Sequence, residues 1–315
     1  MEKIAFGKTD LQISPLIFGG NVFGWTLDEK ESFKILDKIT EIDINCIDTA
    51  DVYSRWVPNN VGGESETIIG KWMKQRNNRE NLIICTKTGM DIGQGGIDIS
   101  AKHILSSVEK SLKRLQTDYI DLYYAHKDDE KTPPEETLEA FQKLIDQGKV
   151  RHIGASNFSA ERLEESLKIS EKNNLPKYKV LQPEYNLLTR KEFEENKQKL
   201  CEKYGLGVAT YFSLASGVLT GKYENESDIE KSSRTDQVKK YWNEKTFKVL
   251  EKLKTVSENH NTSQAAVSLA WIMQNPNITA PIVSATKQNH LAALKDAVSI
   301  KLSSEETKLL NNVSS

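Results

Sequence analysis

Four side chains that can carry or hold a proton stand just after short apolar runs of the sequence: Asp48, Tyr53, Lys87 and His126. Each type alone is more often a turn residue, a packing group or a solvated charge. Their occurrence together, after three separate runs, favours a reaction site over four unrelated surface residues. An acid, a phenol, an ammonium and an imidazole are suited to delivering a proton to an oxygen atom.

Tyr53 is the candidate proton donor, although a free tyrosine, with a pKa of about 10, is a weak acid at neutral pH. An ammonium beside the ring favours the phenolate, so we expect Lys87 to lower the pKa of Tyr53. Asp48 supplies the opposite charge that an enclosed Lys87 needs. We expect His126 to orient the substrate oxygen from the other side without carrying a formal charge. The chemistry that needs all four is proton delivery to a carbonyl oxygen during hydride transfer.

The elements that must position these side chains follow a repeated pattern. Short apolar runs rich in β-branched residues alternate with amphipathic stretches of helical length, and no linker divides them. Eight runs occur, at residues 16–18, 44–47, 82–85, 120–124, 150–153, 180–181, 207–209 and 278–283. Eight strand-then-helix units in 315 residues predict an α/β fold, a (β/α)₈ TIM barrel, as a single domain over residues 1–315. The C-terminal ends of the strands of such a barrel converge on one mouth, where we expect the four side chains to meet.

Local signals agree with this arrangement. Ser100 and Ser159 precede helical patterns as expected N-caps. Residues 3–6 and 11–14 flank a polar turn, which predicts an N-terminal β-hairpin that closes the bottom of the barrel.

The main alternative is an open doubly wound sheet, which should carry a glycine-rich phosphate-binding turn after its first strand. The chain has no such turn there. The glycine-rich stretch 93–96 follows a poor strand and is separated from the next helical pattern, so we interpret it as a loop.

The composition favours a small-molecule partner. Lys plus Arg number 43 against 45 Asp plus Glu, a balance that does not attract the whole molecule to nucleic acid or to an anionic membrane. The three cysteines are far apart and not in metal-ligand spacing, so we expect no metal site and no structural disulfide. The first residues lack the order of an export signal, and we expect a cytoplasmic protein. The sequence does not indicate the oligomeric state.

The chain resembles the aldo-keto reductase superfamily over essentially its whole length. The motifs that carry the resemblance are Asp48-Thr49-Ala50 with Tyr53, Gly63-Glu64-Ser65-Glu66, Thr86-Lys87, His126, Gly154-Ala155-Ser156-Asn157-Phe158, Gln182-Pro183-Glu184-Tyr185-Asn186 and the stretch 214–223. The resemblance implies that the Asp, Tyr, Lys and His form a catalytic tetrad with Tyr53 as general acid. It also implies that the cofactor is NADPH, which lies across the barrel mouth without a glycine-rich fingerprint.

The same resemblance implies a set of cofactor contacts. The nicotinamide carboxamide is expected at Ser156, Asn157 and Gln182, with the ring stacked on Tyr211. The pyrophosphate is expected along the stretch 211–222, and the adenosine 2′-phosphate at the segment 284–290. The expected cofactor-binding residues are Gly20, Asn21, Asp48, Ser156, Asn157, Gln182, Tyr211, Phe212, Ser213, Leu214, Gly217, Lys222, Arg234, Ser284, Thr286 and His290.

The expected substrate-binding residues are Trp25, Tyr53, Trp56 and His126, because loop aromatics at the mouth suit an apolar carbonyl compound. Packing of each tryptophan onto the barrel rim is an equally good explanation. The polar stretch 224–240 is expected to be a mobile flap over the cofactor, or else a passive surface loop.

Two other functions remain open at this stage. The chain also resembles the cytoplasmic β subunits of potassium channels, which share this fold, so a cofactor-binding redox-regulatory subunit is the first alternative. Those subunits have an asparagine where this chain has His126, which favours reduction. The second alternative is an aldolase-type barrel in which Lys87 forms a Schiff base, a role that gives Asp48 and Tyr53 no obvious purpose.

Overall fold

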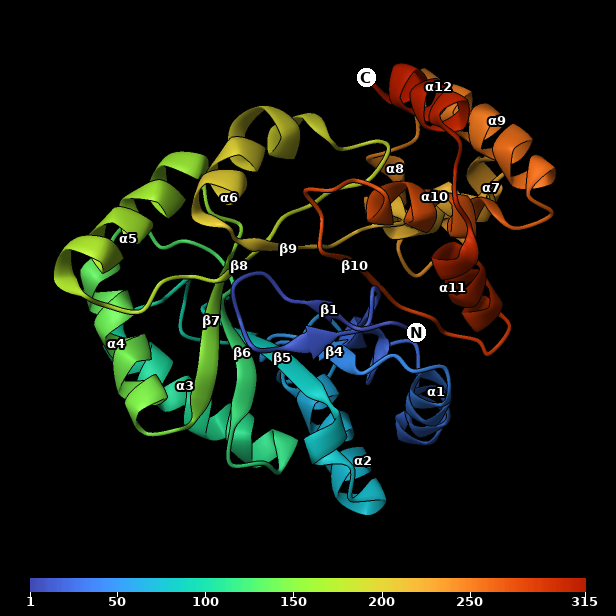
Figure 1. Cartoon of the computed structure of the whole chain (residues 1–315). Coiled ribbons are helices and arrows are strands. Elements are labelled where there is room, and N and C mark those ends of the chain that lie inside the picture. Colours follow the sequence, from blue (N-terminus) through green and yellow to red (C-terminus); the bar gives the residue numbers. More distant parts are fainter.

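The computed structural model describes residues 1–315 and contains a closed barrel of eight parallel strands (Figure 1). The strands are β3 (Ile17–Gly19), β4 (Cys46–Asp48), β5 (Ile83–Thr88), β6 (Ile120–Ala125), β7 (Val150–Ser156), β8 (Val180–Gln182), β9 (Gly207–Thr210) and β10 (Ala280–Val283). They pair in chain order, and β10 closes the barrel against β3. All eight predicted strands are present in the predicted order, which confirms the TIM barrel.

Helices surround the strands, and the four helices α9 to α12 lie together at one side of the barrel (Figure 1). The helices are α1 (Glu29–Glu41), α2 (Glu64–Arg76), α3 (Ala101–Leu115), α4 (Pro134–Asp146), α5 (Ala160–Asn173), α6 (Gln198–Tyr204), α7 (Glu226–Glu230), α8 (Thr235–Lys239), α9 (Glu244–Asn259), α10 (Gln264–Met273), α11 (His290–Ser299) and α12 (Ser304–Ser314). Ser100 and Ser159 accept hydrogen bonds from the first turns of α3 and α5, as expected of N-caps. None of these helices has the length and apolar character needed to cross a membrane.

The predicted N-terminal hairpin is also present. The strands β1 (Ile4–Ala5) and β2 (Gln12–Ile13) pair in antiparallel fashion. Phe6, Leu11 and Ile13 are buried together with residues that point into the barrel, such as Leu122 of β6. The hairpin therefore supplies the apolar plug that the barrel interior needs at its N-terminal end.

The segment between β9 and β10 is the largest addition to the simple repeat. The polar stretch 224–240, expected as a flap or loop, contains the short helices α7 and α8. Ile229 and Val238 are buried, which explains why these turns are helical and pack onto the protein. Movement of the stretch stays a prediction.

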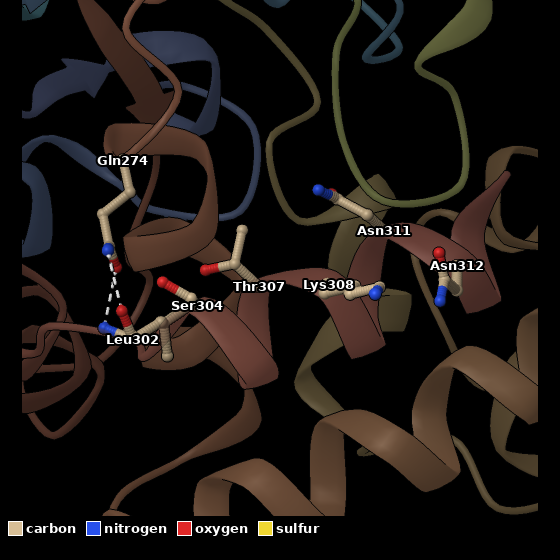
Figure 2. Close-up of a pocket in the computed structure, with 7 residues that line it drawn as sticks. All are labelled: Gln274, Leu302, Ser304, Thr307, Lys308, Asn311 and Asn312. Carbon is tan, nitrogen blue, oxygen red and sulfur yellow. Dashed lines mark hydrogen bonds between the residues drawn. The ribbon is translucent and has the colours of Figure 1, made fainter.

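A hollow of about 440 Å³ lies between the end of α10 and one face of α12 (Figure 2). Its lining is almost entirely polar, and Gln274 at its edge already exchanges two hydrogen bonds with the backbone of Leu302. None of the residues expected at the reaction site lines this hollow.

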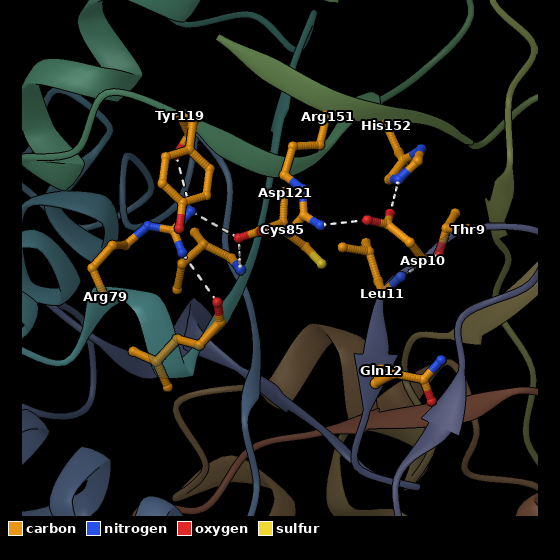
Figure 3. A network of polar contacts seen from close by, with 12 residues as sticks. Thr9, Asp10, Leu11, Gln12, Arg79, Cys85, Tyr119, Asp121, Arg151 and His152 are labelled. Carbon is orange, nitrogen blue, oxygen red and sulfur yellow. Dashed lines mark hydrogen bonds and ion pairs between the residues drawn. The ribbon is translucent and has the colours of Figure 1, made fainter. Parts of the chain in front are cut away.

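A buried charge network fixes the N-terminal side of the barrel (Figure 3). Asp121 of β6 is 1% exposed and lies 2.7 Å from Arg79 and 2.6 Å from Arg151. Arg151 also contacts Asp10 in the hairpin turn at 2.8 Å, and Asp10 contacts His152 at 2.6 Å. Asp121 thus joins two strands and, through Arg151, the hairpin.

We expect Asp121→Asn to lower the free energy of unfolding by about 3–5 kcal/mol, because it leaves two guanidinium groups without their buried counter-charge. Glu29→Gln, which breaks the exposed 2.6 Å pair with Lys71, is the control and should cost less than about 1 kcal/mol. Urea denaturation of the two variants measures the difference. Equal small losses would show that the network does not stabilise the barrel.

Candidate active site

Lys87 is the centre of the polar cluster at the barrel mouth. Its side chain is fully buried, and its Nζ donates to Asp48 Oδ2 at 2.6 Å, to the Thr49 carbonyl oxygen at 2.7 Å and to Tyr53 Oη at 3.1 Å. These contacts use all three of its N–H groups. The register pairs Asp48 with Cys85, so Lys87 lies two residues further along β5 and on the same inward face. Of these three acceptors, the sequence analysis missed only the Thr49 carbonyl oxygen, because every residue has a backbone carbonyl and its role cannot be predicted from residue types.

Asp48 is held from two sides. Its second carboxylate oxygen accepts a 2.8 Å hydrogen bond from Gln182 Nε2 of β8, across the barrel. Burial by itself lowers the pKa of Lys87, but the Asp48 carboxylate and the Tyr53 oxygen raise it above its usual value. Lys87 is therefore an ammonium, and Asp48 is its counter-ion.

The Lys87 charge lowers the pKa of Tyr53, as expected, but two opposing effects together are larger. Burial raises the pKa of Tyr53 to about 12; the Lys87 charge lowers it, but that effect is smaller than the combined effects of burial and Asp48. The net pKa is high because a buried phenolate loses more hydration than one shared ammonium replaces. Tyr53 is a protonated phenol at neutral pH. Its contact with Asp48 Oδ2 is long, at 3.4 Å, so the proton has only a weak acceptor within the protein.

His126 faces Tyr53, with ring centroids 6.1 Å apart. Burial, and next the Lys87 charge, lower the pKa of His126 well below its usual value, so the imidazole is neutral at pH 7. Its Nδ1 atom is buried and has no hydrogen-bond partner. The structure thus brings together all four side chains of the expected tetrad.

Four residues expected at the nicotinamide form one connected network beside the tetrad. Asn157 Nδ2 donates to Ser156 Oγ at 3.1 Å, and Ser156 Oγ donates to the Gln182 carbonyl oxygen at 2.9 Å. Tyr211 Oη donates to Asn157 Oδ1 at 2.8 Å. Asn157 also donates to the carbonyl oxygen of His126 at 2.9 Å, which ties the network to the tetrad.

The stretch expected at the pyrophosphate has an unusual backbone. Phe212, Ala215 and Ser216 have positive φ angles of 52°, 47° and 56°, a conformation that residues with a side chain seldom adopt. The N–H groups of Ser213 and Leu214 donate to no group in the protein. Such free N–H groups in a tight turn suit an anion. The N–H of Gly217, in contrast, donates to the Leu214 carbonyl oxygen at 2.8 Å.

Basic side chains without acidic partners surround this stretch. Burial, followed by the charges of Lys222 and Lys287, lowers the pKa of His290, so these three groups lie close together. Neither lysine has an ion-pair partner, and Arg234 has none either. These cations lie beside the free N–H groups of Ser213 and Leu214, and together they fit the phosphate groups of a dinucleotide.

The remaining expected cofactor residues lie where β3 and β10 meet. Ser284 Oγ is 2.7 Å from both the Gly19 carbonyl oxygen and Asn21 Oδ1. A Cβ atom at Gly20 would stand 2.9 Å from Ser65 Oγ, so a side chain there would force Ser65 to move. Thr286 is half-buried in the turn before α11.

Aromatic side chains line the rim above Tyr53. Trp25 and Trp56 meet edge to face at 5.5 Å, and Trp56 meets Tyr53 at 6.1 Å. The guanidinium of Arg234 lies 5.0 Å from the ring of Trp25, so the stretch 224–240 contacts this rim. Trp56 is 49% exposed, which leaves part of its ring free for a ligand.

Replacing Lys87 tests whether the cluster depends on its charge. We expect Lys87→Met to lower the free energy of unfolding by about 3–5 kcal/mol, because Asp48 remains buried with one amide partner. Tyr53→Phe removes one hydroxyl and should cost about 1 kcal/mol. Urea denaturation compares them, and a Lys87→Met protein as stable as Tyr53→Phe would contradict a buried ion pair.

Comparison with known proteins gives a consistent result. The Aldo/keto reductase family model matches residues 15–315. Similar proteins include a "Probable voltage-gated potassium channel subunit beta" of Oryza sativa subsp. japonica, 35% identical over 93% of this chain and 90% of that protein. They also include "Uncharacterized oxidoreductase YrpG" of Bacillus subtilis (strain 168), 35% identical over 99% and 96%, and "Norsolorinic acid reductase" of Aspergillus flavus, 30% identical over 98% and 80%. The chain belongs to the aldo/keto reductase family, which supports an oxidoreductase that acts on small carbonyl compounds.

Proposed function

We propose that this protein is an NADPH-dependent reductase that converts an aldehyde or ketone to an alcohol, with Tyr53 as the proton donor. The observation that carries the proposal is the contact of one buried ammonium with both Asp48 and the phenol oxygen, at 2.6 and 3.1 Å. The contacts that link Asp48, Lys87 and Tyr53 have no evident structural purpose at the open end of a barrel. A proton donor, in contrast, needs a cation beside its oxygen.

The side chains divide the proton transfer among them. The Tyr53 proton, with only a 3.4 Å contact to Asp48, is available to a substrate oxygen placed beside it. As the proton leaves, negative charge develops on Oη, and the adjacent Lys87 ammonium stabilises it without moving. Neutral His126 lies on the other side of the substrate oxygen and holds it by a hydrogen bond. The bound dinucleotide supplies the hydride for the carbonyl carbon.

The same geometry supports a set of contacts to the cofactor. The amide groups of Asn157 and Gln182 and the hydroxyl of Ser156 would hold the carboxamide, and Tyr211 would cover one face of the ring. The free N–H groups of Ser213 and Leu214 would bind the pyrophosphate, together with Lys222 and Arg234. The 2′-phosphate, which NADPH has and NADH lacks, would be bound by Ser284, Thr286, Lys287 and His290. The Trp25 and Trp56 rim favours an apolar carbonyl substrate.

We expect Tyr53→Phe to lower kcat by about 10²- to 10⁴-fold while leaving the Kd for NADPH unchanged, because the phenyl ring keeps the shape but cannot give a proton. The measurement is the loss of nicotinamide absorbance with a panel of aldehydes and ketones, together with a fluorescence titration of NADPH. Tyr204→Phe, at the far end of α6, is the matched control. A Tyr53→Phe enzyme with a near-normal rate would remove Tyr53 from the mechanism.

Cofactor choice tests the phosphate site separately. We expect Lys287→Met to raise the Kd for NADPH by about tenfold or more, the value of one charged hydrogen bond, and to leave the Kd for NADH nearly unchanged. Lys295→Met, an unpaired lysine on the exposed side of α11, is the control. Equal weakening for the two dinucleotides would place Lys287 away from the 2′-phosphate.

The similarity to proteins named as potassium channel β subunits supports a second candidate, a cofactor-binding regulatory subunit. Stable capture of a membrane protein by this chain, combined with no turnover of any carbonyl compound, would favour that role over reduction.

A further inference from the structure

Two acidic side chains are buried together on the outer face of β4, β5 and β6, behind the tetrad. Glu66 of α2 is fully buried and has two strong partners. It accepts a 2.6 Å hydrogen bond from Thr86 Oγ1 and pairs with Arg114 Nε of α3 at 2.6 Å. Asp51 is 1% exposed, and neither of its carboxylate oxygens has a hydrogen-bond partner.

The groups that face Asp51 offset a negative charge there only in part. They are Glu66 of α2, Arg114 of α3, Thr88 of β5 and Tyr123 of β6. Arg114 is already paired with Glu66, and the Thr88 hydroxyl is too far from Asp51 to form a full hydrogen bond. Arg114, Thr88 and the Val52 N–H therefore lower the pKa of Asp51 by less than burial and Glu66 raise it. One guanidinium therefore serves two carboxyl groups. Burial, and next the Glu66 charge, raise the pKa of Asp51 to about 8.

The backbone connects Asp51 to Lys87 and to Tyr53, the two residues of the proton-donating contact. Its N–H donates to the Lys87 carbonyl oxygen at 3.1 Å, and the N–H of Thr49 donates to the Cys85 carbonyl oxygen at 2.8 Å. Residues 49–51 thus continue the pairing of β4 with β5 beyond the strand. Tyr53 follows in the same turn, where its N–H donates to the Ala50 carbonyl oxygen at 3.2 Å.

We propose that Asp51 is a positioning residue that seats the segment 49–53 only while its carboxyl group carries a proton. Loss of that proton at alkaline pH places an unpaired charge beside Glu66 in a buried layer. The segment can lower this cost only by moving toward water, which takes Tyr53 away from Lys87. The kcat then falls at a pH at which the protonation of Tyr53 and of His126 has not changed.

The first test is the thermal stability of Asp51→Asn, which has the same shape and cannot ionise. An unfolded aspartate has a pKa of about 3.9. Between that pH and about 8 the folded wild type holds a proton that the unfolded chain has released, so its stability falls as the pH rises. The Tm of Asp51→Asn minus the Tm of the wild type should therefore widen from pH 5 to pH 9. The same difference for Asp118→Asn, an exposed aspartate, should stay constant. A constant gap for Asp51→Asn would overturn the proposal.

A second measurement needs no variant. Burial, and next the Glu66 charge, hold the pKa of Asp51 above its ordinary value. The infrared spectrum of the wild type at pH 6.5 should contain the band of a protonated carboxyl group, and that band should disappear by pH 9.5. Its absence at pH 6.5 would contradict a protonated Asp51.

Hydrogen exchange tests the movement of the segment. At pH 9 the amides of residues 49–57 should exchange several-fold faster in the wild type than in Asp51→Asn, and at pH 6 the two proteins should agree. Equal exchange at both pH values would show that the proton does not hold the segment in place.

The kinetic consequence rests on the proposed function. The wild-type kcat should fall several-fold between pH 7 and pH 9.5, and that of Asp51→Asn should not, with the KM for NADPH unaffected in both. Parallel pH profiles would overturn the kinetic role. If no carbonyl compound is reduced at any pH, the proposed function fails, and the stability and exchange results still decide whether the proton on Asp51 seats the segment.

Discussion

The buried ammonium of Lys87 is the constraint on which the site depends. A charge with no access to water must be matched in place, and three acceptors at 2.6, 2.7 and 3.1 Å do so. Two of them come from the end of β4 and the turn after it, and the third is the phenol of Tyr53. The arrangement therefore requires that β4 and β5 be neighbours with a fixed register, which the closed barrel provides. The hairpin and the Asp121 network close and brace the opposite end of the same strands.

Burial acts on three acidic groups here in different ways, according to their partners. Asp48 faces the barrel interior and has Lys87 as its ion-pair partner at 2.6 Å. Asp51, three residues later and on the outer side, has no free cation, and its pKa rises. Tyr53 shares the Lys87 charge with Asp48, and burial then keeps its proton in place. A weak acid that holds its proton until a substrate oxygen arrives is suited to general acid catalysis, because the proton is not lost to water beforehand.

Much of the fold and of the candidate site could be predicted from residue types and spacing. The eight strands and the hairpin depend on local periodicity, and each helix cap, at Ser100 and Ser159, depends on one side chain. These features can therefore be predicted from the sequence. The net shift of the Tyr53 pKa could not be predicted, because it is a difference between hydration lost and charge gained. The state of Asp51 was also hidden, since it depends on whether Arg114, 63 positions away, is already paired with Glu66. Short helices in the stretch 224–240 depend on the burial of Ile229 and Val238 against the rest of the protein.

The central claim is that Tyr53 is a protonated phenol in contact with the Lys87 ammonium. The most direct measurement is an NMR titration of protein labelled at the ring Cζ of tyrosine, with the Tyr53 signal assigned from the Tyr53→Phe spectrum. The account predicts that this signal keeps the shift of a protonated phenol from pH 6 to pH 10 and that it changes when Lys87 is replaced by Met. A phenolate shift at neutral pH, or a Tyr53 signal insensitive to the loss of the ammonium, would contradict it.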